Sequence, residues 1–354
     1  MTYSWPRLKS LKNCPNTISA SRETHAANLF LNRTLAQGPG LSDEELGHLK
    51  SPIDMCTDDC SNKGNRNQGI ERRSFLSGAT AAVVGVTLGS ELLAQQRQPP
   101  TNALNDPTVI QDYVSFKSGT DMIQGYLARP SKAGRFRAVV VLHGNLHLPE
   151  DHRYTAAQLA QAGFIGLAIK RFSRTPDLTM ADLNRSDRED RRYLSNTFNQ
   201  QELGDAQAAI TFLNTLSYVK SKGVGMVGFC GGGYQSVLLS TKSKDIKAVV
   251  AFYAPPVFSE RYQVPNDRKP NLMDVVAEIR VPVQGHYGMA DPIIPLEDVR
   301  RFEQALRKQK TPAEFFFYEG AAHAFCDYTR PLYNAEAATL AKSRMLDFLK
   351  RTLR

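Results

Sequence analysis

Short apolar runs alternate with helical patterns from residue 137 to the end of the chain, and this alternation limits the fold most strongly. Between the runs, apolar residues recur at helical spacing, as in Leu203, Ala206 and Ile210. Strands that alternate with helices form βαβ units, so we predict an α/β fold with a mainly parallel sheet flanked by helices. Six runs are predicted as buried strands: 137–142, 164–169, 224–229, 248–253, 281–286 and 314–318.

Two more short strands precede this region. They are predicted at 113–116 and 122–127, and a glycine-containing turn between them indicates a hairpin at one edge of the sheet. Two connections, 170–198 and 256–280, are unusually long for a compact domain. Both follow strands, so we expect them at the carboxyl ends of the strands, where open α/β sheets bind ligands.

The first 94 residues differ from the rest. Residues 1–69 lack periodicity and are rich in Asn, Ser, Lys and Asp, so we expect this part to be poorly ordered. Arg72 and Arg73 then precede Phe75, and a run rich in Ala, Val and Gly extends to Gly89 before polar residues follow. A basic, then apolar, then small and polar segment has the layout of an export signal.

The paired arginines resemble the twin-arginine signal, which would make the export machinery a partner and the periplasm the destination. We therefore divide the chain into an N-terminal extension at 1–94, with the signal at about 70–94, and a folded domain at 95–354. Met55 would give this signal a more ordinary distance from an initiator. A short core or amphipathic helix is the alternative, and the protein would then be cytoplasmic.

Charge and composition narrow the range of partners. Residues 95–354 contain 34 Lys and Arg against 26 Asp and Glu, and this net charge of +8 favours anionic substrates or surfaces. Nucleic acid is not an expected partner, because no basic run is interleaved with aromatic residues. The absence of 18 consecutive apolar residues argues against a membrane-spanning helix, and five cysteines do not make a disulfide framework.

A glycine-rich turn follows the predicted strand at 224–229. In it Gly228, Cys230 and Gly232 form the pattern G-x-nucleophile-x-G, in which the glycines make room for a sharp turn that exposes the central side chain. The positive end of the next helix favours a thiolate at Cys230, and the Gly231 backbone N–H could stabilise an oxyanion. An inert buried cysteine in a glycine-rich turn is the alternative.

Two further residues follow in the order that a nucleophile elbow requires. Asp291 comes after the strand at 281–286 and His323 after the strand at 314–318, so both are expected at the same sheet edge as Cys230. We predict that Cys230 attacks a carbonyl carbon, that His323 holds the thiol proton and later activates water, and that Asp291 orients the imidazole. The second oxyanion donor is expected to be the backbone N–H of Asn145.

These motifs resemble those of the dienelactone hydrolase family, which has the α/β-hydrolase fold. The resemblance covers about residues 110–352 and rests on four segments: 141–145, 227–233, 285–295 and 318–325. Cysteine in place of serine at the elbow is its specific mark. The resemblance implies hydrolysis of an ester or lactone through a cysteine, with no metal or organic cofactor.

Two positions depart from the family pattern. The family commonly has a glutamate where this chain has Gly144, so activation of the thiol would depend on His323. Relatives also have an arginine that grips the substrate carboxylate where this chain has Asp327, which puts dienelactone itself in question as the substrate. Five arginines of the first long connection could replace that cation, unless they are solvated surface charges: Arg171, Arg174, Arg188, Arg191 and Arg192.

The function predicted is therefore a cysteine-dependent hydrolase of a small ester or lactone. A non-catalytic protein of the same fold, which binds a ligand or senses oxidants through Cys230 and Cys326, is the alternative. A peptidase of the same fold is a third reading. The sequence specifies neither the natural substrate nor the oligomeric state.

Overall fold

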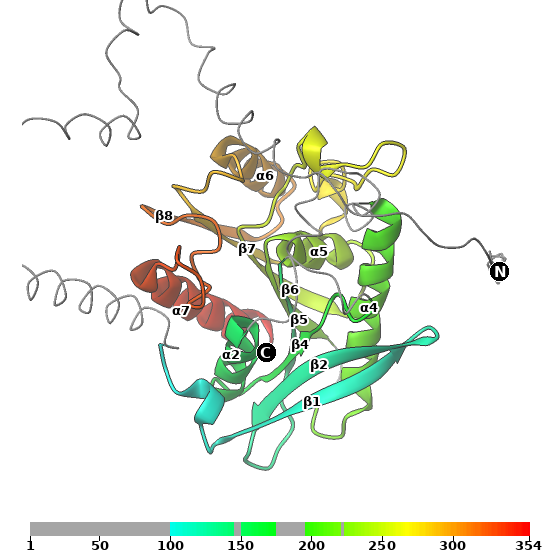
Figure 1. The fold of residues 1–354 in the computed structure, drawn as a ribbon, viewed down its shortest axis with the longest axis vertical. Helices are drawn as coiled ribbons and strands as arrows, with labels where there is room; N and C mark the ends of the chain where they lie inside the picture. Colours follow the sequence, from blue (N-terminus) through cyan, green and yellow to red (C-terminus); the bar gives the residue numbers. More distant parts are fainter. Residues whose placement is uncertain (1–99, 145–149, 175–194, 221–222) are drawn as a thin grey trace, which may run out of the picture. The chain divides into compact units, whose positions relative to one another are not determined.

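The structure is a computed structural model that describes residues 100–144, 150–174, 195–220 and 223–354. The predictions for residues 1–94, Asn145, Arg188, Arg191 and Arg192 lie outside these residues. One sheet contains all eight strands in the order β1-β2-β4-β3-β5-β6-β7-β8 (Figure 1). The strands are β1 (Val109–Ser118), β2 (Asp121–Pro130), β3 (Ala138–Leu142), β4 (Ile165–Ile169), β5 (Val224–Phe229), β6 (Ile246–Phe252), β7 (Val283–Gly288) and β8 (Ala313–Tyr318).

The predicted α/β fold with an edge hairpin is confirmed. Strands β1 and β2 form an antiparallel pair at one edge, and β2 is also antiparallel to β4, whereas all other neighbours are parallel. Strand β7 begins two residues later than predicted. Because Pro282 has no N–H to donate to a ladder, regular pairing starts after it.

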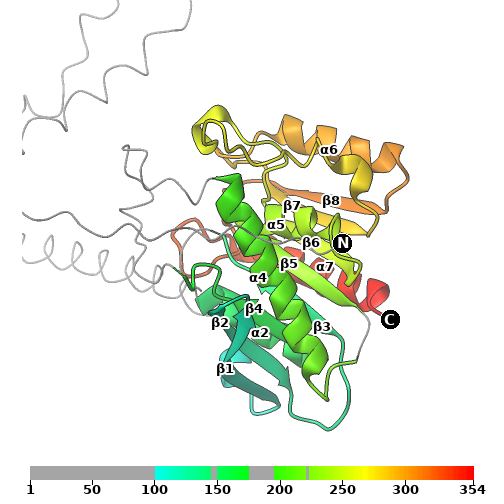
Figure 2. The same cartoon turned by 90° about the vertical axis from the view of Figure 1, so that its right-hand side faces the viewer.

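Helices cover both faces of the sheet. They are α2 (Glu150–Gln161), α4 (Asn196–Thr215), α5 (Gly231–Ser240), α6 (Leu296–Lys308) and α7 (Ala335–Thr352), with three short 3-10 helices η1 (Ala103–Asn105), η3 (Glu260–Tyr262) and η4 (Val276–Glu278). Figures 1 and 2 show α2 and α7 on one face and α4 and α5 on the other. None of the helices within the described ranges is both long and apolar enough to cross a membrane.

Two apolar cores lie on the two sides of the sheet. Every residue of β3, β4 and β5 is buried. Successive side chains of a strand point to opposite faces, so Val139 and Val141 belong to the core under α2 and α7, while Val140 and Leu142 belong to the core under α4 and α5. The parallel strands are thus buried on both faces. Their carboxyl ends all lie at the same edge of the sheet.

Candidate active site

Cys230 is the single residue between β5 and α5, and its backbone is strained. Its φ of 51° and ψ of −120° lie in a region that non-glycine residues rarely adopt. The Cys230 N–H donates to the Phe252 carbonyl at 2.9 Å, and the Cys230 carbonyl accepts from the Tyr234 N–H at 3.1 Å. These bonds to β6 and to the first turn of α5 hold the strained conformation in place.

The glycines beside Cys230 allow the close packing that this turn requires. A Cβ atom at Gly228 would lie 2.3 Å from the Gly232 carbonyl oxygen, and one at Gly232 would lie 2.3 Å from the Leu142 carbonyl oxygen. Neither position can take a side chain without moving backbone. The elbow is therefore packed directly against the end of β3, as the G-x-nucleophile-x-G pattern predicts.

His323 and Asp291 form a tight pair. The His323 Nδ1 lies 2.8 Å from the Asp291 Oδ2, and the other Asp291 oxygen accepts from the backbone N–H groups of Ile293 at 2.8 Å and Ile294 at 3.2 Å. The side chain of His323 is 11% exposed and that of Asp291 only 2%. Because Asp291 engages Nδ1, the other ring nitrogen is left to interact with Cys230, which raises the pKa of His323.

The charges at Cys230 and His323 stabilise each other. Burial alone would raise the pKa of the Cys230 thiol, but the charge and hydrogen bond of His323 and the N–H of Gly231 outweigh it and lower that pKa. Burial alone would lower the pKa of His323, but Cys230 and Asp291 raise it to about 10. Each group thus favours the charged form of the other, and the charged form of a cysteine is its nucleophilic form.

The two predicted oxyanion positions are not equally visible. The Gly231 N–H directly follows Cys230 in the chain and helps to lower the pKa of its thiol. Asn145 lies outside the described residues, but the residue before it is close to the nucleophile, since a Cβ at Gly144 would lie 3.2 Å from the Cys230 Cβ. The end of β3 thus reaches the edge of the elbow, where a second donor is needed.

The structure separates the predicted arginines. Arg171 lines the cavity, but its guanidinium is buried and engaged by Glu202 at 3.0 Å and by backbone carbonyls. Arg174 is not among the cavity residues and pairs instead with Asp121 and Asp205. The geometry therefore gives no support for a substrate contact by Arg174, and it makes Arg171 a partner of the protein rather than of a substrate carboxylate.

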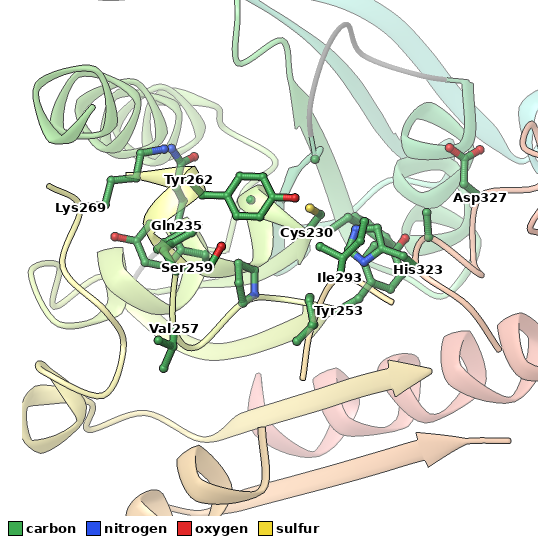
Figure 3. Close-up of a pocket in the computed structure, with 18 of the residues that line it drawn as sticks. Cys230, Gln235, Tyr253, Val257, Ser259, Tyr262, Lys269, Ile293, His323 and Asp327 are labelled. Atoms are coloured by element: carbon green, nitrogen blue, oxygen red, sulfur yellow. The ribbon is translucent and has the colours of Figure 1, made fainter. Parts of the chain in front are cut away.

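A cavity of about 560 Å³ opens at Cys230. Its wall is largely aromatic and apolar, with Tyr253, Phe258 and Ile293 among its members. Figure 3 shows Lys269 and Gln235 on one side of Cys230, and His323 and Asp327 on the other. This volume suits a small organic molecule.

Several cavity residues were not predicted from the sequence. Burial lowers the pKa of Lys269 to about 8. Arg330 lines the cavity and donates to Asp327 at 2.9 Å. Asp327, which stands where relatives have an arginine, thus holds a different arginine close to the site. Tyr253 has a φ of 38°, and its ring lies 5.1 Å from that of His323. Lys269 belongs to the connection 256–280, which the sequence placed at the carboxyl ends of the strands. That placement was the sequence signal that could have indicated Lys269 as a cavity residue.

No three His, Cys, Asp or Glu side chains come together as a metal site in the part of the chain that the structure describes. The groups that meet at the cavity are instead a thiol with a lowered pKa, an imidazole with a raised pKa, the Asp291 carboxyl group and a backbone N–H. Such groups suit attack on a carbonyl carbon and transfer of protons to oxygen.

Comparison with known proteins gives a consistent result. The model of the "Dienelactone hydrolase family" matches residues 123–353. A "Putative carboxymethylenebutenolidase" from Methylorubrum extorquens is 28% identical over 79% of this chain and 93% of its own. A "Probable 2-oxo-3-(5-oxofuran-2-ylidene)propanoate lactonase" from a Bradyrhizobium species is 31% identical over 69% of this chain and 95% of its own.

Solved structures agree with the sequence comparison. The crystal structure of a "Putative Dienelactone Hydrolase" from Klebsiella pneumoniae has a TM-score of 0.60 and 26% identity, and the match covers 69% of this chain and 99% of that one. The family match at 123–353 includes strands β3 to β8, the elbow and both loops that hold Asp291 and His323.

Proposed function

This chain belongs to the dienelactone hydrolase family and is a hydrolase of lactone or ester bonds, and we propose that it works through Cys230, His323 and Asp291. One observation carries this proposal: the strained elbow places Cys230 at the same cavity as His323, whose Nδ1 is held by Asp291 at 2.8 Å. The order of the three residues along the chain matches that of a nucleophile elbow.

The proposed reaction proceeds in two halves. The Cys230 thiolate attacks the carbonyl carbon, and the resulting oxyanion accepts hydrogen bonds from the N–H groups of Gly231 and Asn145. The C–O bond then breaks, and the His323 imidazolium protonates the leaving oxygen, which gives a thioester on Cys230. Neutral His323 next takes a proton from water, the hydroxide attacks the thioester, and the thiolate and the imidazolium return as the acid leaves.

Part of the proposal concerns the substrate. The names of the relatives point to lactones, and in a lactone the leaving oxygen stays attached to the acyl group after the first half-reaction. The net charge of +8 over residues 95–354 favours a substrate that carries an anionic group. Within the first long connection, Arg188, Arg191 and Arg192 are the cations proposed to recognise it.

The test is a panel of lactones and chromogenic esters, each in an acidic and a neutral form. Wild-type protein should hydrolyse members of the panel and Cys230→Ala should not. Mass spectrometry of rapidly quenched reactions should find the acyl group on Cys230. A direct ion pair should favour acidic members about 10- to 150-fold in kcat/KM, and alanine at position 188, 191 or 192 should remove that preference. Equal turnover of acidic and neutral members would contradict the charge preference.

A redox-sensing function has less support than hydrolysis. Cys230 and Cys326 are both free thiols, but Cys326 is fully buried, and burial raises its pKa well above the usual value. A protonated, inaccessible thiol is a poor partner for reversible oxidation.

We also propose that the segment around Arg72 and Arg73 directs export through the twin-arginine pathway. The support is the sequence pattern alone: paired arginines, an apolar run and a polar stretch before the folded domain. Changing both residues to lysine should leave the precursor in the cytoplasm while the hydrolase stays active in a cell lysate. Mature protein in the periplasm of that variant would contradict the proposal.

A further inference from the structure

The guanidinium of Arg171 hydrogen-bonds to backbone carbonyls just after strand β3. It donates to the His143 carbonyl at 2.6 Å and also to the Gly144 carbonyl, and the Arg171 backbone N–H donates to His143 Nε2 at 3.0 Å. Three hydrogen bonds therefore connect this residue to the two residues that bring β3 to the elbow.

The Gly144 carbonyl belongs to the peptide group whose N–H is the proposed second oxyanion donor. A trans peptide is planar, and its C=O and N–H point in opposite directions. A group that fixes the carbonyl therefore also fixes the direction of the N–H. A cation on the carbonyl also polarises the peptide and strengthens its N–H as a donor.

Arg171 is itself held by a buried carboxylate. Glu202 of α4 accepts from Arg171 at 3.0 Å, and the same Glu202 oxygen accepts from Gln235 of α5. The side chains of Arg171 and Glu202 are 5% and 3% exposed. Since α5 starts at the nucleophile, this one carboxylate links the loop after β3 to the elbow helix.

Stability alone is a weak reason for such an arrangement. A buried ion pair often contributes no more than an apolar pair of the same size, because both charges lose their hydration. What this pair does provide is a fixed geometry at two backbone carbonyls. The positive charge of Arg171 also adds to the groups that lower the pKa of Cys230.

We infer that Arg171 is a positioning residue, which orients the peptide after Gly144 for stabilisation of the oxyanion, and that Glu202 and Gln235 hold it in place. The inference rests on the proposed function, because it assigns a role within that mechanism. It also gives this chain a buried cation behind the loop in which Gly144 replaces the family's glutamate.

The chain offers a matched control for this role. Arg174 and Asp205 lie three residues after Arg171 and Glu202, and they also connect the segment after β4 to α4. The Arg174 guanidinium, however, donates to the Ser118 carbonyl at the hairpin and does not line the cavity. Loss of this second pair removes a comparable contact between the same two segments and leaves the loop after β3 untouched.

The experiment compares two double variants of the full chain, Arg171→Met/Glu202→Gln and Arg174→Met/Asp205→Asn. Each removes both charges of one pair, so that no buried charge is left unpaired. With a p-nitrophenyl ester, the first variant should lose about 10²- to 10³-fold in kcat, as when one oxyanion donor is lost, with KM changed only a few fold. The control should keep kcat within about twofold. Arg171→Lys should restore part of the rate, because lysine can donate to the carbonyls but lacks the second nitrogen with which Arg171 also binds Glu202.

A second readout separates positioning from a merely structural role. Alkylation of Cys230 by iodoacetamide should require a higher pH in the Arg171 variant than in the control, because a positive charge near the thiolate is lost. If the double variant does not fold, Glu202→Gln takes its place and should lower kcat at least about tenfold, since a shift of about 1 Å costs as much as 10².

The possible failures can be told apart. Turnover that survives in Cys230→Ala would overturn the proposed function and this inference with it. A protein that requires Cys230, but whose folded Arg171 or Glu202 variants keep kcat within threefold of wild type, would overturn this inference alone. An equal loss of kcat in the control variant would also overturn it, because the effect would then come from the contact between segments.

Discussion

Two buried histidines near the carboxyl ends of neighbouring strands have opposite protonation states. His286 lies within β7, where its ring nitrogens meet the Tyr318 hydroxyl at 2.8 Å and the Gln284 side-chain oxygen at 2.9 Å. His323 follows β8, and its ring nitrogens meet Asp291 and Cys230. Burial lowers the pKa of His286 to about 3, whereas the pKa of His323 is raised to about 10.

The difference shows that partners, and not burial, decide which of the two histidines carries a charge. Burial disfavours the charged form of both rings. A hydroxyl and an amide satisfy the hydrogen bonds of His286 but do not stabilise a positive charge, and its ring stacks on Phe252 at 4.6 Å. A carboxylate and a thiolate stabilise charge on His323. The first ring is a neutral part of the core, and the second is a charged group that lines the cavity.

The largest effect that would test this comparison is on turnover. Cys230→Ala or His323→Ala should reduce kcat/KM by about 10³-fold or more, because nucleophile and base act as one unit. The matched change His286→Gln should leave kcat/KM near the wild-type value, although it lowers stability. Initial rates on a chromogenic ester measure all three. If His286→Gln abolished turnover in folded protein, the distinction between the two histidines would be wrong.

A smaller effect on turnover is expected when Asp291, the carboxylate that His286 lacks as a partner, is changed. Asp291→Asn keeps the size of the side chain but removes the charge behind His323, and we expect kcat to fall by about 10²-fold. The loss should be milder than for Cys230→Ala, since cysteine is a strong nucleophile by itself. Steady-state kinetics give the comparison. A rate above one third of wild type would show that Asp291 does not orient the imidazole.

The next effect concerns the pH at which Cys230 reacts. Because His323 lowers the pKa of Cys230, iodoacetamide should alkylate the wild-type thiol at pH values where an ordinary cysteine is slow. In His323→Ala the rate at pH 6 should fall at least about tenfold, as expected for a shift of one pKa unit or more. His286→Gln should leave the profile unchanged. Identical profiles for wild type and His323→Ala would rule out the ion pair.

The smallest effect, per pH unit, is on the stability of the folded state. Between pH 6.5 and about 3 the unfolded chain binds a proton at His286 that the native state does not, so stability falls as the pH falls through this range. The slope is about 1.4 kcal/mol per pH unit for each such histidine. His323 is protonated in both states there and adds no slope. Urea titrations at several pH values give the free energy of unfolding against pH. In His286→Gln its slope should be smaller by the contribution of one proton, and an unchanged slope would contradict a neutral His286.

Much of this architecture follows from local sequence. The apolar runs predicted the strands, and the glycines around Cys230 predicted a turn that only residues without a Cβ can pack. The order of Cys230, Asp291 and His323 predicted their meeting, because residues that follow parallel strands share one edge of the sheet. These signals depend on neighbours in the chain or on topology, and both can be derived from sequence.

The electrostatic partners could not be derived in this way. Arg171 was predicted as a substrate contact, and nothing in the sequence indicated that Glu202 would engage it. The periodicity that located α4 uses only its apolar face, and Glu202 is buried beside that face. Which charge meets which depends on how the segment after β4 crosses the helix, and no spacing along the chain encodes this. The low pKa of Lys269 has the same origin, since burial causes it.

The hydrogen bond from the Cys230 N–H to β6 has a consequence for exchange with solvent. This amide lies between two central strands whose residues are almost all buried, so no local opening exposes it without separating β5 from β6. Deuterium should therefore enter at Cys230 only as fast as the whole domain unfolds. The strain at the nucleophile thus persists for the lifetime of the folded molecule.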